Sequence, residues 1–456
     1  MRTSYAAAAI FCIVAAVDCT SPISLQGDSR WTIPQALSIL HEHNLNLDEY
    51  ASRFPSQNYY FIECVSANHV RVYPVHEATC PGGHFYYLDP VAIAILAAPL
   101  VAVFEVILRL IHPLIGPFVA GHSVPVQAFL NGDLVGGSAI VEILIASFFI
   151  AVAAAVLFIA LRQIVSFPPA TVLALVFSFG TSAWSTACRA LFSHAPSILL
   201  NCLMLLIVVK SWKRPGILWL LGPVAALAFF VRPTNAIPLG VLGLYLLLRA
   251  PRQVMWAALA ALPVVASFVA MNVSAYGAIL APYFLPNRAN LSSMTINANL
   301  PQALFANWIS PGRGLLVYSP FFLLLFTPLA WRTNGVAPEF RKIRPFLITI
   351  VLLHWLLISL QYDWWAGYSY GPRYMSDLLP YLIVLLAPGF QAVFERRPGF
   401  RFDRAFLACF VAIALYIHAR GAYSTAVHGW NSTPVDVNVA PSRVWDWTDP
   451  AFLRRL

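Results

Sequence analysis

The stretch SAIVEILIASFFIAVAAAVLFIAL, from Ser138 to Leu161, decides the fold of this chain. It contains one acidic residue, Glu142, and no basic residue. A helix of about 20 mostly apolar residues crosses the hydrocarbon core of a bilayer, where lipid offers no partners to the backbone of an open strand. The stretch therefore predicts a membrane-spanning α-helix.

Apolar stretches of similar character recur along most of the 456-residue chain. They lie near residues 5–21, 91–111, 138–161, 169–185, 195–209, 216–231, 235–248, 254–275, 315–331, 345–360, 376–394 and 404–419. Hydrophobic residues form 59% of the sequence and charged residues only 10%, a balance that excludes an ordinary soluble protein. We therefore predict an all-α polytopic membrane protein with a bundle of about 12–13 transmembrane helices.

The basic residues predict how this bundle is oriented. The formal net charge is +9. Four short loops hold much of the positive charge: Lys210, Lys213 and Arg214; Arg249 and Arg252; Arg332, Arg341, Lys342 and Arg344; and Arg396, Arg397, Arg401 and Arg404. Such clusters mark cytoplasmic loops, so the charge indicates topology and not a nucleic-acid partner.

The loops between these clusters then lie on the extracytoplasmic side, together with the tail. They are the loops near 186–194, 231–235, 276–314 and 361–375, and the tail begins after about residue 420. Twelve crossings that start in the cytoplasm would also end there, which conflicts with an outer tail. We therefore expect one more crossing within 91–137, where 113–130 is apolar.

This topology divides the chain into six regions. They are a first, uncleaved transmembrane helix (1–22), an extracytoplasmic loop with short juxtamembrane helices (23–90), a transmembrane bundle (91–275), an extracytoplasmic loop (276–314), a second part of the bundle (315–419) and an extracytoplasmic tail (420–456). Cys64 and Cys80 both fall in the first loop, so we expect them to form a disulfide in an oxidising compartment. The sequence has no CxxC or HExxH pattern, and we assign no metal ligands.

A carboxylate opens the first extracytoplasmic loop. Asp28 stands in the segment GDSRW, which ends at Trp31 and follows the first apolar stretch. Thr32 and Pro34 can start a short helix there, with the hydroxyl as its cap. Asp28 then either caps a turn or presents a catalytic carboxylate at the membrane face, beside a tryptophan that suits the interface.

Four arginines lie on the same predicted face of the membrane. Arg189, with His194, belongs to GTSAWSTACRALFSHAP (180–196), Arg232 to VRPTN (231–235), Arg313 to SPGRGLLVYSP (310–320) and Arg373 to QYDWWAGYSYGPRYMS (361–376). The last segment also contains Asp363, Trp364, Trp365, Tyr368 and Tyr370. Singly, each arginine can be explained by a side chain that reaches the membrane surface. Together they oppose the positive-inside bias, which indicates a bound anion.

These segments, in this order, resemble those of GT-C glycosyltransferases, multi-spanning enzymes that use polyprenyl-phosphate sugars. Asp28 in DSRW is similar to the first-loop acid of that family, and the segments around the four arginines resemble those of a bacterial branch of it. The resemblance covers residues 26–450. It implies a GT-C-like bundle in which extracytoplasmic loops form the active site.

The resemblance also implies an activity and a set of residue roles. A hexosyl or pentosyl group would pass from a polyprenyl-phosphate donor to a hydroxyl of a glycan, lipid or protein acceptor, with inversion and with Asp28 as general base. The residues that would bind the donor phosphate are Arg189, His194, Arg232, Arg313 and Arg373. Those that would bind sugar or lipid are Trp31, Asp363, Trp364, Trp365, Tyr368 and Tyr370. No cofactor is required. A divalent metal is possible: many relatives have a second carboxylate beside this acid, but Asp28 has only Ser29 there.

The resemblance places the protein in the bacterial inner membrane, with its site facing the periplasm or exterior. Two other functions fit the same residues. One is transport or flipping of a lipid-linked anionic substrate, for which two related halves would be typical and no internal repeat is visible. The other is a non-catalytic subunit of an envelope assembly complex, whose aromatic loops would form a protein interface.

Overall fold

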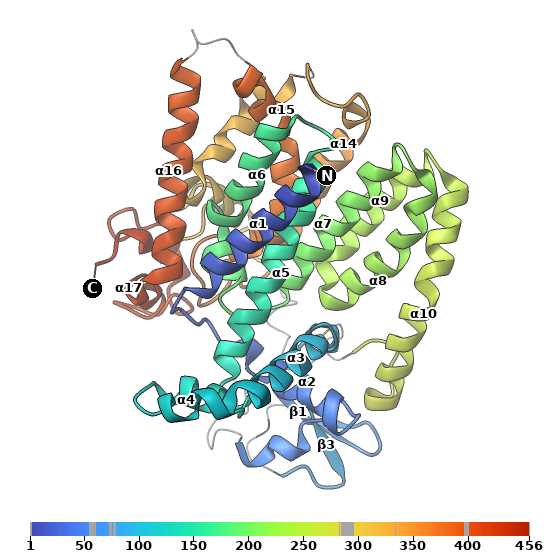
Figure 1. Ribbon diagram of the computed structural model, residues 1–456, viewed down its shortest axis with the longest axis vertical. Coiled ribbons are helices and arrows are strands. Elements are labelled where there is room, and N and C mark those ends of the chain that lie inside the picture. The colour runs from blue at the N-terminus through green and yellow to red at the C-terminus, as the bar shows by residue number, and fades with distance from the viewer. Residues whose placement is uncertain are drawn as a thin grey trace.

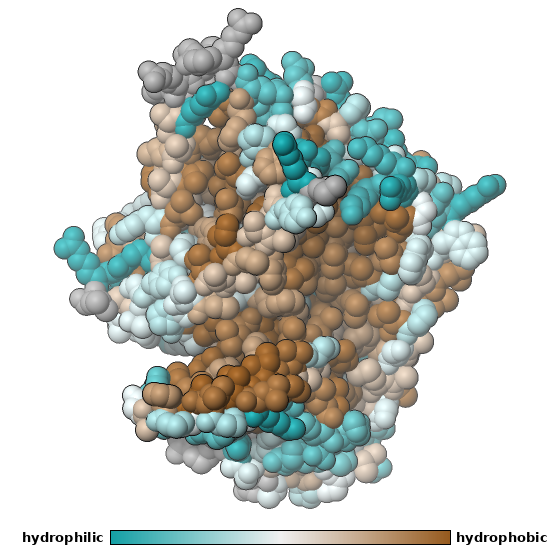
Figure 2. All heavy atoms as spheres, in the orientation of Figure 1, coloured by the Kyte–Doolittle hydropathy of each residue, from teal (hydrophilic) through white to brown (hydrophobic). Residues whose placement is uncertain are grey.

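The computed structural model of this chain describes residues 2–53, 61–72, 75, 79–281, 283, 296–332, 334–395 and 401–455. Within these ranges the chain is mostly helical. Long helices pack side by side into a bundle, and a small β-sheet lies at one end of it (Figure 1). Apolar residues cover much of the flank of the bundle that Figure 2 presents. The chain is a polytopic, membrane-embedded helical protein, as predicted.

Eight helical segments in the described part of the chain are long and apolar enough to cross a membrane. Their helices are α1 (Arg2–Cys19), α3 (Val91–Ile115), α5 (Ser138–Leu161), α7 (His194–Ser211), α10 (Pro251–Tyr276), α14 (Phe340–Leu360), α15 (Leu379–Glu395) and α16 (Arg401–Tyr423). Three shorter apolar helices join them: α6 (Phe167–Phe179), α8 (Leu221–Val231) and α9 (Ala236–Leu247). The count among the described residues is therefore lower than the 12–13 helices predicted.

One predicted span is broken into short pieces. The stretch 315–331 forms α13 (Leu315–Tyr318), η8 (Pro320–Phe326) and η9 (Pro328–Trp331). Each proline at the start of a piece lacks the N–H group that a continuous helix needs, so the helix restarts there.

Helix α5 lies at the centre of the bundle, packed between α1 and α7. Its bounds coincide with the apolar stretch that predicted it. Ala151, Ala153 and Ala154 are fully buried on it. Small side chains let neighbouring membrane helices approach closely, which explains the position of this helix.

The region 91–137 does not contain the additional crossing that we expected. Helix α3 runs across one end of the bundle and packs mainly against α2 (Thr32–His41) (Figure 1). After a proline-containing turn, helix α4 (Val124–Leu130) folds back beside α3, with the rings of Phe104 and Phe129 6.4 Å apart. A helix as short as α4 is far below the length that spans a bilayer.

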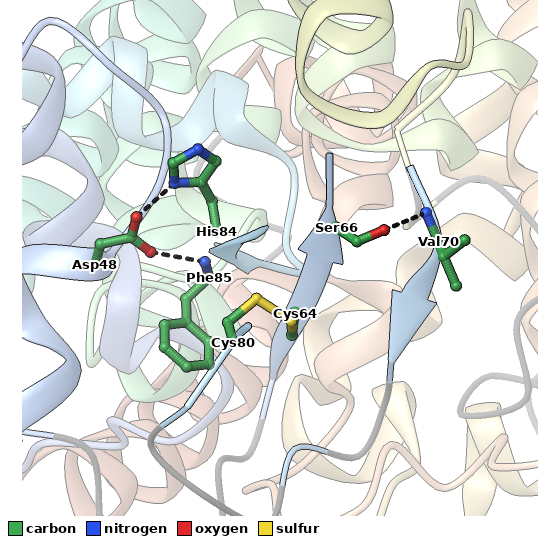
Figure 3. The surroundings of a disulfide bond; sticks show 7 residues. All are labelled: Asp48, Cys64, Ser66, Val70, Cys80, His84 and Phe85. Carbon is green, nitrogen blue, oxygen red and sulfur yellow. Dashed lines mark hydrogen bonds and ion pairs between the residues drawn. A yellow bond between two sulfur atoms is a disulfide. The ribbon is translucent and has the colours of Figure 1, made fainter. Parts of the chain in front are cut away.

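The loop 23–90 contains a β-sheet that the sequence did not reveal. Its strands are β1 (Ile62–Ser66), β2 (Arg71–Val72) and β3 (Gly83–Tyr87), in the antiparallel order β2-β1-β3. The predicted disulfide between Cys64 and Cys80 is present and joins β1 to the segment before β3 (Figure 3). Asp48 also holds β3, because it accepts a hydrogen bond from the Phe85 N–H at 2.8 Å.

The two ends of the bundle differ in charge. One end is formed by the end of α7, the starts of α10 and α14, and the loops next to them. It carries Lys210, Lys213, Arg214, Arg249, Arg252, Arg332, Arg341, Lys342 and Arg344. We call this the basic end. The opposite end, which we call the site end, carries the sheet, α12 (Leu300–Ile309), η10 (Arg373–Leu378) and the C-terminal segment from α17 (Thr425–His428) onward.

Candidate functional site

Asp28 and Arg373 meet at the site end of the bundle. Asp28 begins η1 (Asp28–Trp31), which follows α1 after a short extended segment, and Arg373 begins η10. Asp28 Oδ2 lies 3.2 Å from Arg373 Nη2, although the two residues are 345 positions apart in sequence. The side chain of Arg373 is only 14% exposed and that of Asp28 31%. A carboxylate and a guanidinium thus face each other in a half-buried place between two loops.

His194, in its neutral form, links Arg373 to Asp377. His194 Nδ1 lies 3.0 Å from Asp377 Oδ2, and His194 Nε2 lies 3.4 Å from Arg373 Nε. The guanidinium has only N–H donors, so Nε2 must be the acceptor in that contact. Nδ1 then carries the proton and donates a hydrogen bond to Asp377 Oδ2. With this tautomer, hydrogen bonds and an ion pair connect Asp377, His194, Arg373 and Asp28 in that order.

Arg232 joins the same cluster through Asp377. Arg232 Nε lies 2.9 Å from Asp377 Oδ2, and Arg232 Nη1 donates to Ser193 Oγ at 2.7 Å. The residue sits where α8 ends and the backbone becomes extended ahead of Pro233. That break turns the side chain back toward the cluster. Asp377 is 1% exposed, so this is a buried ion pair.

A second carboxyl group lies next to Asp28. The hydroxyl of Tyr87 contacts both the backbone carbonyl of Asp28 and Asp89 Oδ2, the latter at 2.9 Å. The single hydrogen of this hydroxyl is shared between the two acceptor oxygens. Burial, followed by the negative charge of Asp28, raises the pKa of Asp89 to about 7. Burial and the neighbouring charge thus favour the protonated form of Asp89 relative to a carboxyl group in water.

Glu142 anchors the segment that carries Asp28. One of its carboxylate oxygens accepts from Ser29 Oγ at 2.5 Å and from the Leu191 N–H at 3.0 Å. The other accepts from Gln26 Nε2 at 2.5 Å. Since Glu142 stands on the central helix α5 and is fully buried, it ties the residues on both sides of Asp28 to the rigid bundle.

Two of the predicted phosphate-binding arginines lie elsewhere. Arg189 is fully buried, donates to the backbone carbonyls of Trp184 and Asp18 at 3.1 and 2.8 Å, and so holds the end of α1. Arg313 donates to the carbonyls of Trp365 and Gly367 at 2.6 and 2.9 Å. Burial lowers the pKa of the Arg313 guanidinium to about 10. The contacts of both arginines are those of structural clamps.

The aromatic residues of the loop 361–372 are mostly part of a packed core. Trp364, Trp365 and Tyr370 are 4%, 7% and 0% exposed, in a cluster with the C-terminal segment. Tyr368 is 55% exposed and contacts Asp436. Of the four aromatic residues of this loop that we predicted to bind sugar or lipid, Tyr368 is therefore the one that a ligand can reach.

Two further predicted ligand contacts can also be placed. Asp363 accepts a hydrogen bond from the Tyr374 hydroxyl at 3.0 Å, next to Arg373 in sequence. Trp31 is buried at 5% exposure and packs beneath the β-sheet of the loop 23–90. Asp363 therefore lies near the cluster, whereas Trp31 supports the fold beside it.

Sequence reasoning missed Asp89, Asp377 and the anchoring role of Glu142. Asp89 had a detectable signal, because it directly precedes Pro90 and the apolar stretch of α3. Asp377 gave a weaker one, an acid at the start of an apolar helix four residues after Arg373. In the described ranges, no group of three or more His, Cys, Asp or Glu side chains is placed to hold a metal ion. The predicted lack of a required cofactor stays a prediction.

No protein-family model matches this chain, and no curated protein matches it. The candidate site offers the carboxyl groups of Asp28, Asp89 and Asp377, the guanidinium groups of Arg232 and Arg373, and the neutral imidazole of His194 at one end of a membrane bundle.

Proposed function

We propose that this chain is an integral-membrane glycosyltransferase of the GT-C kind, which moves a hexosyl or pentosyl group from a polyprenyl-phosphate donor to an acceptor hydroxyl. The observation that carries the proposal is the 3.2 Å contact between Asp28 and Arg373 at the end of the apolar helices. A lipid-linked donor keeps its chain among such helices and its phosphate at their ends. A guanidinium there binds the phosphate, and a carboxylate beside it takes a proton.

The donor phosphate would replace Asp28 as the partner of Arg373. Guanidinium groups bind phosphate oxygens through paired hydrogen bonds, and Arg232 adds positive charge to the same cluster. His194 keeps Arg373 aligned while this exchange takes place. Asp28, released from its ion pair, can then face the acceptor.

The transfer itself would be a direct displacement. The acceptor oxygen forms a bond to the anomeric carbon while the bond from that carbon to the phosphate oxygen breaks. Asp28 takes the hydroxyl proton, and polyprenyl phosphate leaves with the bonding electron pair. Arg373 stabilises the negative charge that grows on the leaving oxygen. Asp89, in its protonated form, adds no repulsion to Asp28, and Tyr368 and Asp363 lie in the loop that would meet the sugar.

We further propose that the site end faces the exterior of a bacterial inner membrane. The basic clusters then lie in the cytoplasm. In this proposal α3, which lies across the end of the bundle, does not cross the membrane. The crossing segments would be the other seven long helices, the three shorter apolar helices α6, α8 and α9, and the broken stretch 315–331. An odd number of crossings puts the N-terminus and the C-terminal tail on opposite sides, which agrees with the charges. The acceptor would be a glycan, lipid or protein of the envelope, and the bilayer itself is the lasting partner.

The direct test is sugar transfer by the purified chain. The protein in lipid nanodiscs is given polyprenyl-phosphate sugars with a radiolabelled sugar, together with envelope extracts as acceptors. Asp28→Asn should lower transfer by about 10²–10⁴-fold, the usual contribution of a general base. Asp48→Asn is the matched control, because Asp48 is a carboxylate of the same loop that pairs with His84 in the sheet, and it should leave transfer unchanged.

Three outcomes would reject the proposal. Full turnover by Asp28→Asn removes the catalytic role of that residue. Movement of intact donor across the membrane without transfer identifies a flippase. Transfer that depends on an added envelope protein, and that is insensitive to Asp28→Asn, identifies a non-catalytic subunit.

A further inference from the structure

An apolar groove lies on the flank of the bundle, separate from Asp28. Its volume is about 400 Å³, and its walls come from α12, α13, η8, η9, α14 and α15. Its lining includes Trp308, Phe326, Trp331, Leu352 and Trp355. Phe326 and Leu352 are 67% and 51% exposed, so the groove opens to the side of the bundle where lipid would lie. Among the described residues that line it, Arg344 alone is charged.

The groove runs along α14 from the basic end toward the site end. Arg344 lies in the first turns of this helix and Trp355 further along it. The helix rises 1.5 Å per residue, so the distance between them is about 16 Å. The hydrocarbon core of a bilayer is about 30 Å thick, so the groove matches the depth of one leaflet. Its length suits one lipid chain and not a whole membrane-spanning helix.

The rim of the groove at the basic end carries a net positive charge. The Arg344 guanidinium lies 4.9 Å from the ring centroid of Trp331, an arrangement typical of the membrane interface. Arg332, Arg341 and Lys342 belong to the same end of α14 and the loop before it. Glu339 and Glu395 also lie at this end, and they are outnumbered by Arg332, Arg341, Lys342 and Arg344.

We propose that this groove binds one acyl chain of an anionic glycerophospholipid, with its phosphate at Arg344. Basic residues next to a transmembrane helix attract anionic headgroups, and the apolar wall accommodates the chain. The site differs from the donor site in position, because the donor phosphate would lie at Arg373 on the opposite end of the bundle. The inference therefore does not depend on the proposed glycosyl transfer.

Photo-crosslinking tests this inference on the full chain. The protein is placed in phosphatidylcholine nanodiscs that contain a low fraction of phosphatidylglycerol with a diazirine in one acyl chain. After illumination, crosslinked peptides are identified by mass spectrometry. The expected result is labelling of peptides from 300–331 and 340–360, displaced by unlabelled phosphatidylglycerol and not by phosphatidylcholine.

Two variants distinguish the effect of the Arg344 charge from the effect of the space in the groove. Arg344→Gln should lower the preference for phosphatidylglycerol over phosphatidylcholine at this groove by about fivefold, since one basic residue near the surface contributes about 1 kcal/mol. The double change Ile348→Phe and Leu352→Phe should reduce labelling by either lipid, because it fills the space. Arg252→Gln is the control, since Arg252 is also at the basic end but does not line the groove.

Several results would overturn the proposal. Equal displacement by both lipids in the unaltered protein would mean an unselective lipid annulus. An unchanged preference in Arg344→Gln would remove the proposed headgroup contact. Displacement by polyprenyl phosphate at far lower concentrations than by phosphatidylglycerol would assign the groove to a lipid-linked substrate instead.

Discussion

The buried ion pair between Arg232 and Asp377 should dominate the stability of the cluster. Asp377 is 1% exposed and also accepts from His194. Asp377→Leu leaves Arg232 as a buried, unpaired charge, which costs about 3–5 kcal/mol. It also leaves the Nδ1–H of His194 without an acceptor, which costs about 1–3 kcal/mol more. Arg232→Met alone should cost about 3–5 kcal/mol, because Asp377 loses its cation.

The double variant should be more stable than Asp377→Leu. With both charges gone, only the unpaired Nδ1–H of His194 remains, so the expected loss is about 1–3 kcal/mol. The free energies of unfolding can be measured by equilibrium denaturation in mixed detergent micelles and compared as a double-mutant cycle. If the loss in the double variant equals the sum of the two single losses, the pair is not coupled and the reasoning fails.

An exposed ion pair provides the control for this cycle. Arg53 Nη1 lies 3.1 Å from Asp133 Oδ1, and the two side chains are 50% and 41% exposed. Because solvent screens such a pair, the variants Arg53→Met and Asp133→Leu should show a coupling of about 0–1 kcal/mol. A coupling there as large as that at Asp377 would mean that the assay does not report burial.

Three further changes test other parts of the structure. The folded protein raises the pKa of Asp89 from 3.8 to about 7, so the folded state binds this proton more tightly and the free energy of unfolding should fall as pH rises through that window. Asp89→Asn should therefore stabilise the protein at pH 8 by up to about 4 kcal/mol and have little effect at pH 4. Cys80→Ala, which removes the bond to Cys64, should cost about 2–4 kcal/mol and abolish the effect of reductant on thermal unfolding. Gly222→Ala should cost about 1–3 kcal/mol, because a Cβ there would lie 1.8 Å from a carbonyl oxygen of α10, whereas Gly240→Ala, in open space, should not destabilise.

Each of these has a clear opposing result. A pH-independent difference between Asp89→Asn and the unaltered protein would mean that Asp89 ionises as it does in water. Equal thermal unfolding of Cys80→Ala and the oxidised protein would show that the disulfide does not stabilise the fold. Similar stability of the Gly222 and Gly240 variants would contradict the close packing of α8 and α10.

The sequence predicted the helical segments well because the membrane constrains them locally. An apolar stretch must satisfy its own backbone groups, so α5 could be located to the residue from composition alone. The sequence also placed Cys64 and Cys80 in one loop, where they form their disulfide. Apolar composition failed at 91–137, since the same apolar residues suit a helix across the membrane or one along the end of a bundle.

The candidate site depends more on tertiary packing than the helices do. The sequence identified four arginines on one face, and locally they look alike. Tertiary packing decided that Arg373 meets Asp28 and that Arg232 pairs with Asp377, while backbone carbonyls occupy Arg189 and Arg313. The residue type shows that a charge is present at the membrane face, but the partner of that charge depends on which distant loops fold together. Only the three-dimensional arrangement fixes which acceptor each guanidinium reaches.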